Sequence, residues 1–409
     1  MRQVTDFVPQ PGNSISTRAV LLLGSAVALG TAIYITRGFY SPLGIALLSL
    51  ALLLCAVAAV GPGSLDHVFT IPVRGLHGNG PILLGLLLFT HLVIGIVTIR
   101  SDPRPNNDVW VFHTDSANAL RNGINPYSIT FPNIYYPDTW VYAPKVVKGD
   151  RLLFGYPYPP LTLAVTSAGH LALGDPRYAM LLCMAATGML IWTLRPDFIG
   201  VAIAAIFLFT PSFPFVLDMG WTEPVQALLL AGVVVCAIRA PGLLGIALGL
   251  LIASKQYMPI VLVLFPLSMQ NLDRRKMMRD LLIAAGIAIL VTVPLALWDL
   301  KAFTHSVITL QLDQPFRKDA LSYLNLWRNG REGWIGPFWV AFAAMGISIA
   351  LCYWRRIRFP IAAAFCFFMF FAFNKQAFAN YYYFVVAALC IAAAGETLNR
   401  GARLCLKAQ

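Results

Sequence analysis

The chain has 409 residues, of which 58% are hydrophobic and 12% are charged, and its mean hydropathy is +0.70. Soluble domains carry about 25% charged residues, so this composition excludes a water-soluble globular protein. The formal net charge of +12 fits lysine and arginine enrichment in cytoplasmic loops, with attraction to anionic lipid phosphates as a second source. Because the basic residues are scattered among apolar segments, nucleic acid is not an expected partner.

Apolar stretches close to the ~20 residues that span a bilayer recur along the whole chain. They predict a single all-α polytopic membrane domain over residues 1–409, with about 12 transmembrane helices. The expected helices are 19–36, 43–61, 81–99, 159–173, 178–194, 198–217, 222–238, 242–268, 281–298, 334–354, 360–373 and 378–396. They define N-terminal helices (18–99), an acidic loop (100–158), a helical core (159–298), a second loop (299–333) and C-terminal helices with a tail (334–409).

Short basic clusters predict the orientation in the membrane. The clusters NLDRRKMMRD (271–280) and RRIR (355–358), and the basic C-terminal tail, are expected on the cytoplasmic side. Counting back along the spans places both termini in the cytoplasm and the loops 100–158 and 299–333 outside. The expected location is the plasma (inner) membrane.

The segment 242–268 admits two interpretations. It is long for one helix, carries Lys255 near its middle and has Pro259 shortly after it. It is either one tilted span with a buried lysine or two half-length helices that meet at Lys255. Interrupted helices are tolerated in membranes where they line a polar cavity.

The stretch DVWVFHTDSANALRNGINPY, which begins at Asp108, predicts a short amphipathic helix at the membrane interface. Asn106 or Asn107 can cap the helix at its start, and Gly123 and Pro126 end it.

One face of this helix presents carboxylates. Asp108 and Asp115 lie two turns apart on the same face, and Val109, Ser116 and Leu120 form a neighbouring face that could rest on the membrane. The helix dipole favours an ionised aspartate in the first turn, which suits a general base at neutral pH. The alternative is that Asp108 merely stabilises the start of a helix in a solvated loop.

These residues resemble the first extracytoplasmic loop of the GT-C class of integral-membrane glycosyltransferases. The resemblance is to the bacterial branch, glycosyltransferase family 87, that includes mycobacterial phosphatidylinositol-mannoside mannosyltransferases. In that branch the loop has an acid followed by an aromatic residue, which are Asp108 and Phe112 in this chain. A Gly-x-x-Pro-Tyr turn follows, here Gly123–Tyr127, and then Tyr-Pro-Pro opens a helix, here Tyr158–Pro160. Segments 217–230, 253–267 and 374–390 resemble later family segments, so the resemblance runs in order over about 100–400. The chain departs from the family by two extra apolar spans before the acidic loop, and it lacks the Asp-x-Asp of some eukaryotic relatives.

The resemblance implies an inverting transfer of one sugar from a polyprenyl-phosphate-sugar donor. Mannose is the expected sugar, and arabinofuranose and glucose stay open. The acceptor would be a lipid or glycan hydroxyl, and the active site would face the extracytoplasmic side among membrane lipids. No cofactor is firmly implied, no metal ligand is assigned, and a requirement for a divalent metal stays open. Such a reaction needs a base for the acceptor proton and cationic or hydrogen-bonding groups for the leaving phosphate.

Asp108 is the candidate catalytic base, with Asp115 as reserve base or substrate ligand. Lys255 is the candidate phosphate ligand because a cation inside an apolar segment is costly and usually functional; the alternative is a lysine that reaches the interface. The remaining candidate substrate-binding residues are Tyr158, Glu223, Gln256, His305, Arg317 and Lys375. Helix capping, aromatic interface belts and solvated loop charges are the structural alternatives for these residues.

Two other classes of function remain open. A lipid or solute transporter or flippase would use Lys255 but leaves the acidic loop without a role. A non-catalytic scaffold of the cell envelope predicts that Asp108→Ala leaves function intact.

Overall fold

The structure is a computed structural model, and it describes residues 14–37, 40–70, 79–137, 141–268, 274–328 and 336–396. Within these ranges, five helices are long and apolar enough to cross a membrane: α1 (Thr17–Thr36), α2 (Pro42–Val60), α3 (Gly80–Ser101), α6 (Arg177–Leu194) and α12 (Arg274–Ala296). The shorter apolar helices include α5 (Pro160–Leu173), α7 (Phe198–Leu208), α16 (Trp339–Trp354), α17 (Phe359–Ala372) and α18 (Ala379–Gly395). The predicted helical architecture is confirmed, and the apolar helices indicate an integral membrane protein. The figure of about 12 spans stays a prediction.

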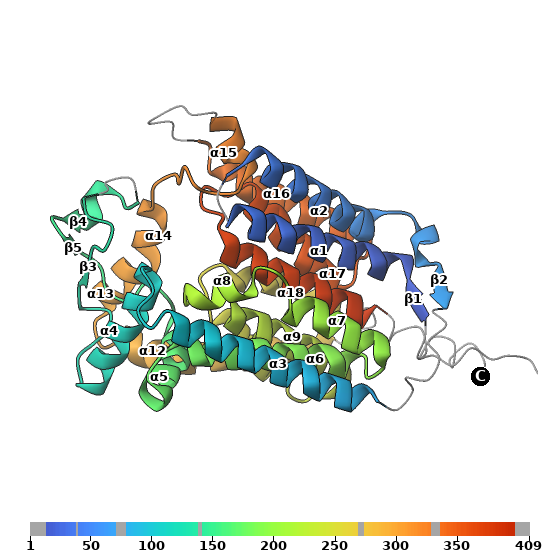
Figure 1. The fold of residues 1–409 in the computed structure, drawn as a ribbon, viewed down its shortest axis with the longest axis horizontal. Coiled ribbons are helices and arrows are strands. Elements are labelled where there is room, and N and C mark those ends of the chain that lie inside the picture. The colour runs from blue at the N-terminus through green and yellow to red at the C-terminus, as the bar shows by residue number, and fades with distance from the viewer. Residues whose placement is uncertain are drawn as a thin grey trace, which may run out of the picture.

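Helix α18 forms the centre of the bundle. It packs against α1 and α17 on one side and against α6, α7 and α9 (Glu223–Arg239) on the other (Figure 1). Almost all of its residues are buried, which explains why it is apolar around its whole circumference. The N-terminal helices α1 and α2 form a hairpin that covers α17 and α18.

Two of the predicted spans are interrupted. The expected helix 198–217 ends at Leu208 and resumes as α8 (Phe213–Asp218), since Pro211 lacks an N–H and disfavours helical geometry in the residue before it. The segment 242–268 consists of α10 (Leu244–Ile252), an irregular stretch around Lys255, and the short turns η4 (Met258–Ile260), α11 (Val261–Leu264) and η5 (Phe265–Ser268). The interpretation with an interruption at Lys255 therefore describes this segment.

The two polar segments gather at one end of the bundle (Figure 1). The first contains α4 (Asp108–Arg121), η3 (Pro144–Val146) and an antiparallel sheet of β3 (Phe131–Pro132), β5 (Arg151–Leu152) and β4 (Val147–Lys148), with β5 in the centre. The second, expected as a loop, is largely helical, with α13 (Leu300–Thr304), the π-helical turn η6 (His305–Thr309), α14 (Leu310–Asp313) and α15 (Tyr323–Arg328).

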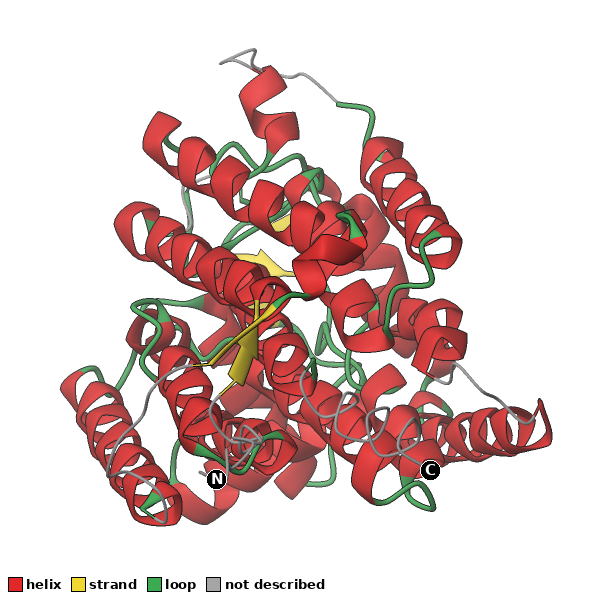
Figure 2. Cartoon of the chain, turned by 90° about the vertical axis from the view of Figure 1, so that its right-hand side faces the viewer, coloured by secondary structure: helices red, strands yellow, loops and turns green. Residues whose placement is uncertain are grey.

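Basic side chains hold the opposite end together. There, β1 (Ser14–Ser16) pairs with β2 (Val68–Thr70), which follows η2 (Gly63–Asp66) (Figure 2). Arg195 donates to the Ser14 carbonyl at 2.5 Å, and Arg355 donates to the Val60 carbonyl at 2.9 Å. Arg358 pairs with Glu396 at 3.1 Å beyond the end of α18.

Candidate functional site

Helix α4 begins where the sequence predicts. Asn107 is the N-cap, and its side chain accepts a hydrogen bond from the Val109 N–H at 2.8 Å, which leaves Asp108 in the first turn. The predicted cap and helix are confirmed. The face expected to rest on the membrane is instead covered by protein, because Val109 and Ser116 are buried and α4 packs against α5. That part of the prediction is wrong because periodicity identifies an apolar face without identifying what covers it.

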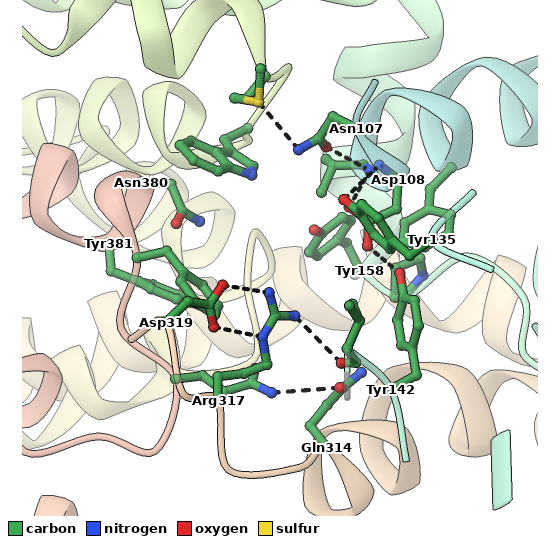
Figure 3. Close-up of a pocket in the computed structure, with 18 of the residues that line it drawn as sticks. Asn107, Asp108, Tyr135, Tyr142, Tyr158, Gln314, Arg317, Asp319, Asn380 and Tyr381 are labelled. Atoms are coloured by element: carbon green, nitrogen blue, oxygen red, sulfur yellow. Dashed lines mark hydrogen bonds and ion pairs between the residues drawn. The ribbon is translucent and has the colours of Figure 1, made fainter. Parts of the chain in front are cut away.

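The Asp108 carboxylate is half-buried and is held by two tyrosines. The Tyr142 hydroxyl donates to Oδ2, and the Tyr135 hydroxyl lies 3.4 Å from Oδ1 (Figure 3). Burial raises the pKa of Asp108 above its usual value, while the Tyr142 hydrogen bond and the positive charge of Arg317 act in the opposite direction. The carboxylate is thus desolvated enough to gain basicity, and its hydrogen bonds oppose part of that rise.

Asp108 opens into a cavity of about 500 Å³ at the end of the bundle. Its walls come from the end of α1, from α4, from residues between β3 and η3 and residues after β5, from α8, from α14 and the segment after it, and from the start of α18. Its charged lining residues are Arg37, Asp108, Arg317 and Asp319, and its polar and aromatic lining includes Tyr135, Tyr142, Tyr158, Trp221, Gln311, Gln314, Gln376, Asn380 and Tyr381.

The wall across from Asp108 carries Arg317 (Figure 3). Its Nε and Nη2 donate to the two carboxylate oxygens of Asp319 at 2.9 and 2.7 Å, and its Nη1 lies 3.4 Å from the Val141 carbonyl. The guanidinium also lies 4.9 Å from the centre of the Phe378 ring. Burial opposes the charge, but the bonds with Asp319 and the nearby Asp108 raise the pKa of Arg317.

Tyr158 and Tyr381 separate the cavity from a buried ion pair. Lys255, 4% exposed, pairs with the fully buried Glu223 and donates to the Thr222 hydroxyl at 2.8 Å. The Lys255 ammonium lies 5.1 Å from the Tyr158 ring centre and 5.5 Å from that of Tyr381. Two predicted site residues are therefore partners of each other and lie behind two aromatic rings that line the cavity.

The other predicted site residues have different positions. Gln256 donates to the carbonyls of Pro157 at 2.7 Å and Val307 at 3.2 Å, and thereby joins the cavity wall to η6. The Lys375 ammonium donates to the Gln314 carbonyl at 2.8 Å, and His305 Nε2 lies 3.2 Å from the Leu153 carbonyl. Asp115 is exposed on α4 and does not line the cavity.

The structure thus brings Asp108, Tyr158 and Arg317 to one cavity, with Lys255 and Glu223 behind it. Sequence reasoning did not identify the lining residues Arg37, Tyr135, Tyr142, Gln311, Gln314, Asn380 and Tyr381. Three consecutive tyrosines at 381–383 are a sequence signal that could have indicated Tyr381. The other residues have no comparable signal in their neighbouring sequence.

Comparisons with known proteins show a likeness in structure alone. No family model matches the chain, and no curated protein matches it. ArnT from Cupriavidus metallidurans in the apo state is similar with a TM-score of 0.49 and 17% identity, over 79% of this chain and 60% of that one. ArnT bound to undecaprenyl phosphate gives a TM-score of 0.47 and 18% identity, over 79% and 61% of the two chains. The chain therefore spans about 60% of the length of these proteins, and at these values the likeness assigns it neither a family nor an activity.

Proposed function

We propose that the chain is an integral-membrane glycosyltransferase that moves one sugar from a polyprenyl-phosphate-sugar donor to a hydroxyl of a lipid or glycan acceptor. The observation that carries this proposal is the half-buried Asp108 carboxylate, which opens into a cavity across from Arg317 at one end of a bundle of apolar helices. The sequence resemblance to the GT-C class supports it independently.

In the proposed reaction, the acceptor oxygen attacks the anomeric carbon and the bond from that carbon to the phosphate oxygen breaks. The bonding electrons leave with the phosphate, the acceptor proton passes to Asp108, and the configuration inverts. Tyr142 and Tyr135 orient the base through their hydrogen bonds. The cavity rings of Tyr158 and Tyr381 offer apolar faces for the sugar, and Arg317 offers positive charge to the phosphate.

We propose that the end with the cavity is extracytoplasmic and that both chain termini are cytoplasmic. The support is the sequence prediction that the basic clusters 271–280 and 355–358 are cytoplasmic, because Arg355 and Arg358 of the second cluster lie at the end of the bundle far from α4. A basic cytoplasmic end is the arrangement that membrane insertion favours.

Mannose is the first sugar to test, since it is the one implied by the family resemblance. A metal requirement remains to be measured. Among the described residues, no cluster of three or more histidine, cysteine or acidic side chains is placed to hold a metal ion.

A transporter or flippase is the second candidate, and the interruption at Lys255 favours it because broken helices form solute sites in transporters. However, the charge of Lys255 is satisfied by Glu223 inside the protein. Transport also gives no chemical role to a tyrosine-bound carboxylate in the cavity.

The test uses purified protein in lipid nanodiscs, radiolabelled polyprenyl-phosphate-mannose and a lipid extract of the host. Wild type should transfer label to a new lipid, and Asp108→Asn should lower the rate by about 10²- to 10⁴-fold, the usual contribution of a general base. Asp115→Asn is the matched control, because it changes an exposed aspartate of the same helix outside the cavity.

Each result has a defined meaning. Loss of transfer in Asp115→Asn alone would move the base to Asp115, and equal transfer by all three proteins would remove both aspartates from the chemistry. If wild type binds the donor without transferring label, other sugars are tested next. Absence of donor binding would reject the glycosyltransferase in favour of the transporter.

A further inference from the structure

Arg37 brings an additional positive charge to the cavity. It is the C-cap of α1, it is exposed, and it lines the same cavity as Asp108 and Arg317. Within the described ranges, its guanidinium has no hydrogen-bond or ion-pair partner. Its backbone has φ 50°, a left-handed conformation that is costly for a residue other than glycine, asparagine or aspartate.

The position of Arg37 is set by packing of the α1–α2 hairpin. Helix α1 lies along α18, whose first turn also lines the cavity. At the start of α2, a Cβ added to Gly44 would lie 3.1 Å from the Leu321 side chain, and the Ser49 hydroxyl lies 2.8 Å from that of Tyr323. The hairpin is thus docked on the segment that carries Arg317, so both arginines reach the cavity from elements in contact.

The other candidate cations near the cavity already have partners. Arg317 is engaged by both oxygens of Asp319, and Lys255 is paired with Glu223 behind Tyr158. Lys375 donates to main-chain carbonyls and does not line the cavity. Among the described residues that line the cavity, Arg37 is therefore the cation without a carboxylate partner, and an anion that enters can bind it.

We propose that Arg37 binds the phosphate of the polyprenyl-phosphate donor, a proposal that rests on the function proposed above. A guanidinium presents several N–H donors in a plane and matches two phosphate oxygens at once. During transfer the phosphate changes from a diester with one negative charge to a monoester with about 1.5 to 2. Arg37 therefore binds the released polyprenyl phosphate more strongly than the intact donor.

The test measures equilibrium binding of undecaprenyl monophosphate, and of uncharged undecaprenol, to full-length protein in nanodiscs. Arg37→Asn removes the positive charge and places a residue that tolerates the left-handed backbone conformation. Arg37→Lys keeps the positive charge but lacks the planar guanidinium that can bind two phosphate oxygens at once. The matched control is Arg121→Gln, an exposed arginine in the last turn of α4 that does not line the cavity.

Arg37→Asn should weaken binding of undecaprenyl monophosphate by about ten- to hundredfold, as expected for loss of a charged hydrogen-bonding group. Arg37→Lys should recover part of this loss, and Arg121→Gln should bind like wild type. Undecaprenol binding should be the same in all four proteins. Equal phosphate binding by wild type and Arg37→Asn, with sugar transfer intact, would overturn the role of Arg37 and leave the proposed function standing. If wild type binds the phosphate no better than the alcohol and transfers no sugar, both proposals fail together.

Discussion

The hydrogen bond from Tyr142 to Asp108 allows a quantitative test of the catalytic base. Burial raises the pKa of Asp108, and the Tyr142 hydroxyl is the largest influence that lowers it. Tyr142→Phe removes only the hydroxyl, so the pKa of Asp108 must rise further. Because the carboxylate form accepts the acceptor proton, the acidic limb of the rate profile must move to higher pH.

The size of the shift follows from the strength of one hydrogen bond. A hydrogen bond to a charged group contributes about 1.5–3 kcal/mol when buried. Asp108 is half-buried, so water replaces part of the lost bond and the lower end of this range applies. At about 1.36 kcal/mol per pKa unit, the limb should move up by about one unit. Below the limb the rate should fall about tenfold, and well above it the rate should match wild type.

The assay is sugar transfer in nanodiscs at limiting acceptor over a range of pH, so that kcat/KM reports the free enzyme. Tyr135→Phe should give a smaller shift, because its hydroxyl lies 3.4 Å from the carboxylate. Tyr136→Phe, which changes an exposed tyrosine next to it, should give none. An acidic limb in Tyr142→Phe that coincides with that of wild type, or lies at lower pH, would refute Asp108 as the titrating base.

Three further outcomes are expected. Asp108→Asn should raise the unfolding temperature at neutral pH, because the native state no longer buries an ionised carboxylate. The gain in unfolding temperature should disappear as the pH falls through the raised native pKa of Asp108. Thermal unfolding measured over a series of pH values tests this, and a gain that grows in acid would contradict it. Lys255→Met should cost about 3–5 kcal/mol of unfolding free energy by leaving Glu223 buried without its partner, and Lys255→Met combined with Glu223→Gln should recover most of it. Sugar transfer by that double variant would show that Lys255 is not the phosphate ligand. Gly155→Ala would place a Cβ 2.1 Å from the Tyr127 carbonyl oxygen, so a loss of about 1–3 kcal/mol and a lower unfolding temperature are expected, and an unchanged temperature would contradict the close packing.

The helix that carries Asp108 could be predicted because its signals are local. An asparagine cap, an aspartate in the first turn and a glycine after the last turn lie within one short stretch, and their effects act through neighbouring backbone groups. The apolar helices could be predicted for the same reason, since length and hydropathy are properties of single segments. The breaks near Pro211 and Lys255 follow from proline and from a charge in an apolar run.

The contacts that define the cavity could not be predicted, because they join distant parts of the chain. The cost of burying Lys255 is visible in sequence, but its compensation by Glu223 depends on how α9 packs beside α10. Arg37 follows an apolar run, as many flanking arginines do, and only the packing of α1 on α18 places it at the cavity. Tyr142 reaches Asp108 through the fold of an irregular loop, for which periodicity has no information.

The charges of the cavity explain why one unpaired arginine matters to this reaction. Among the described residues, the charged lining consists of two arginines and two aspartates, whose charges cancel when all four are ionised. A phosphodiester donor brings one negative charge, and proton transfer to Asp108 moves a second negative charge onto the phosphate without changing the total. The chemical step therefore moves negative charge from Asp108 to the phosphate. A cation that lies closer to the phosphate than to Asp108 stabilises this shift of charge. Because Arg317 is already paired with Asp319, stabilisation of the new negative charge on the phosphate depends on Arg37. Replacing Arg37 with an uncharged residue should therefore slow sugar transfer even when the donor is saturating.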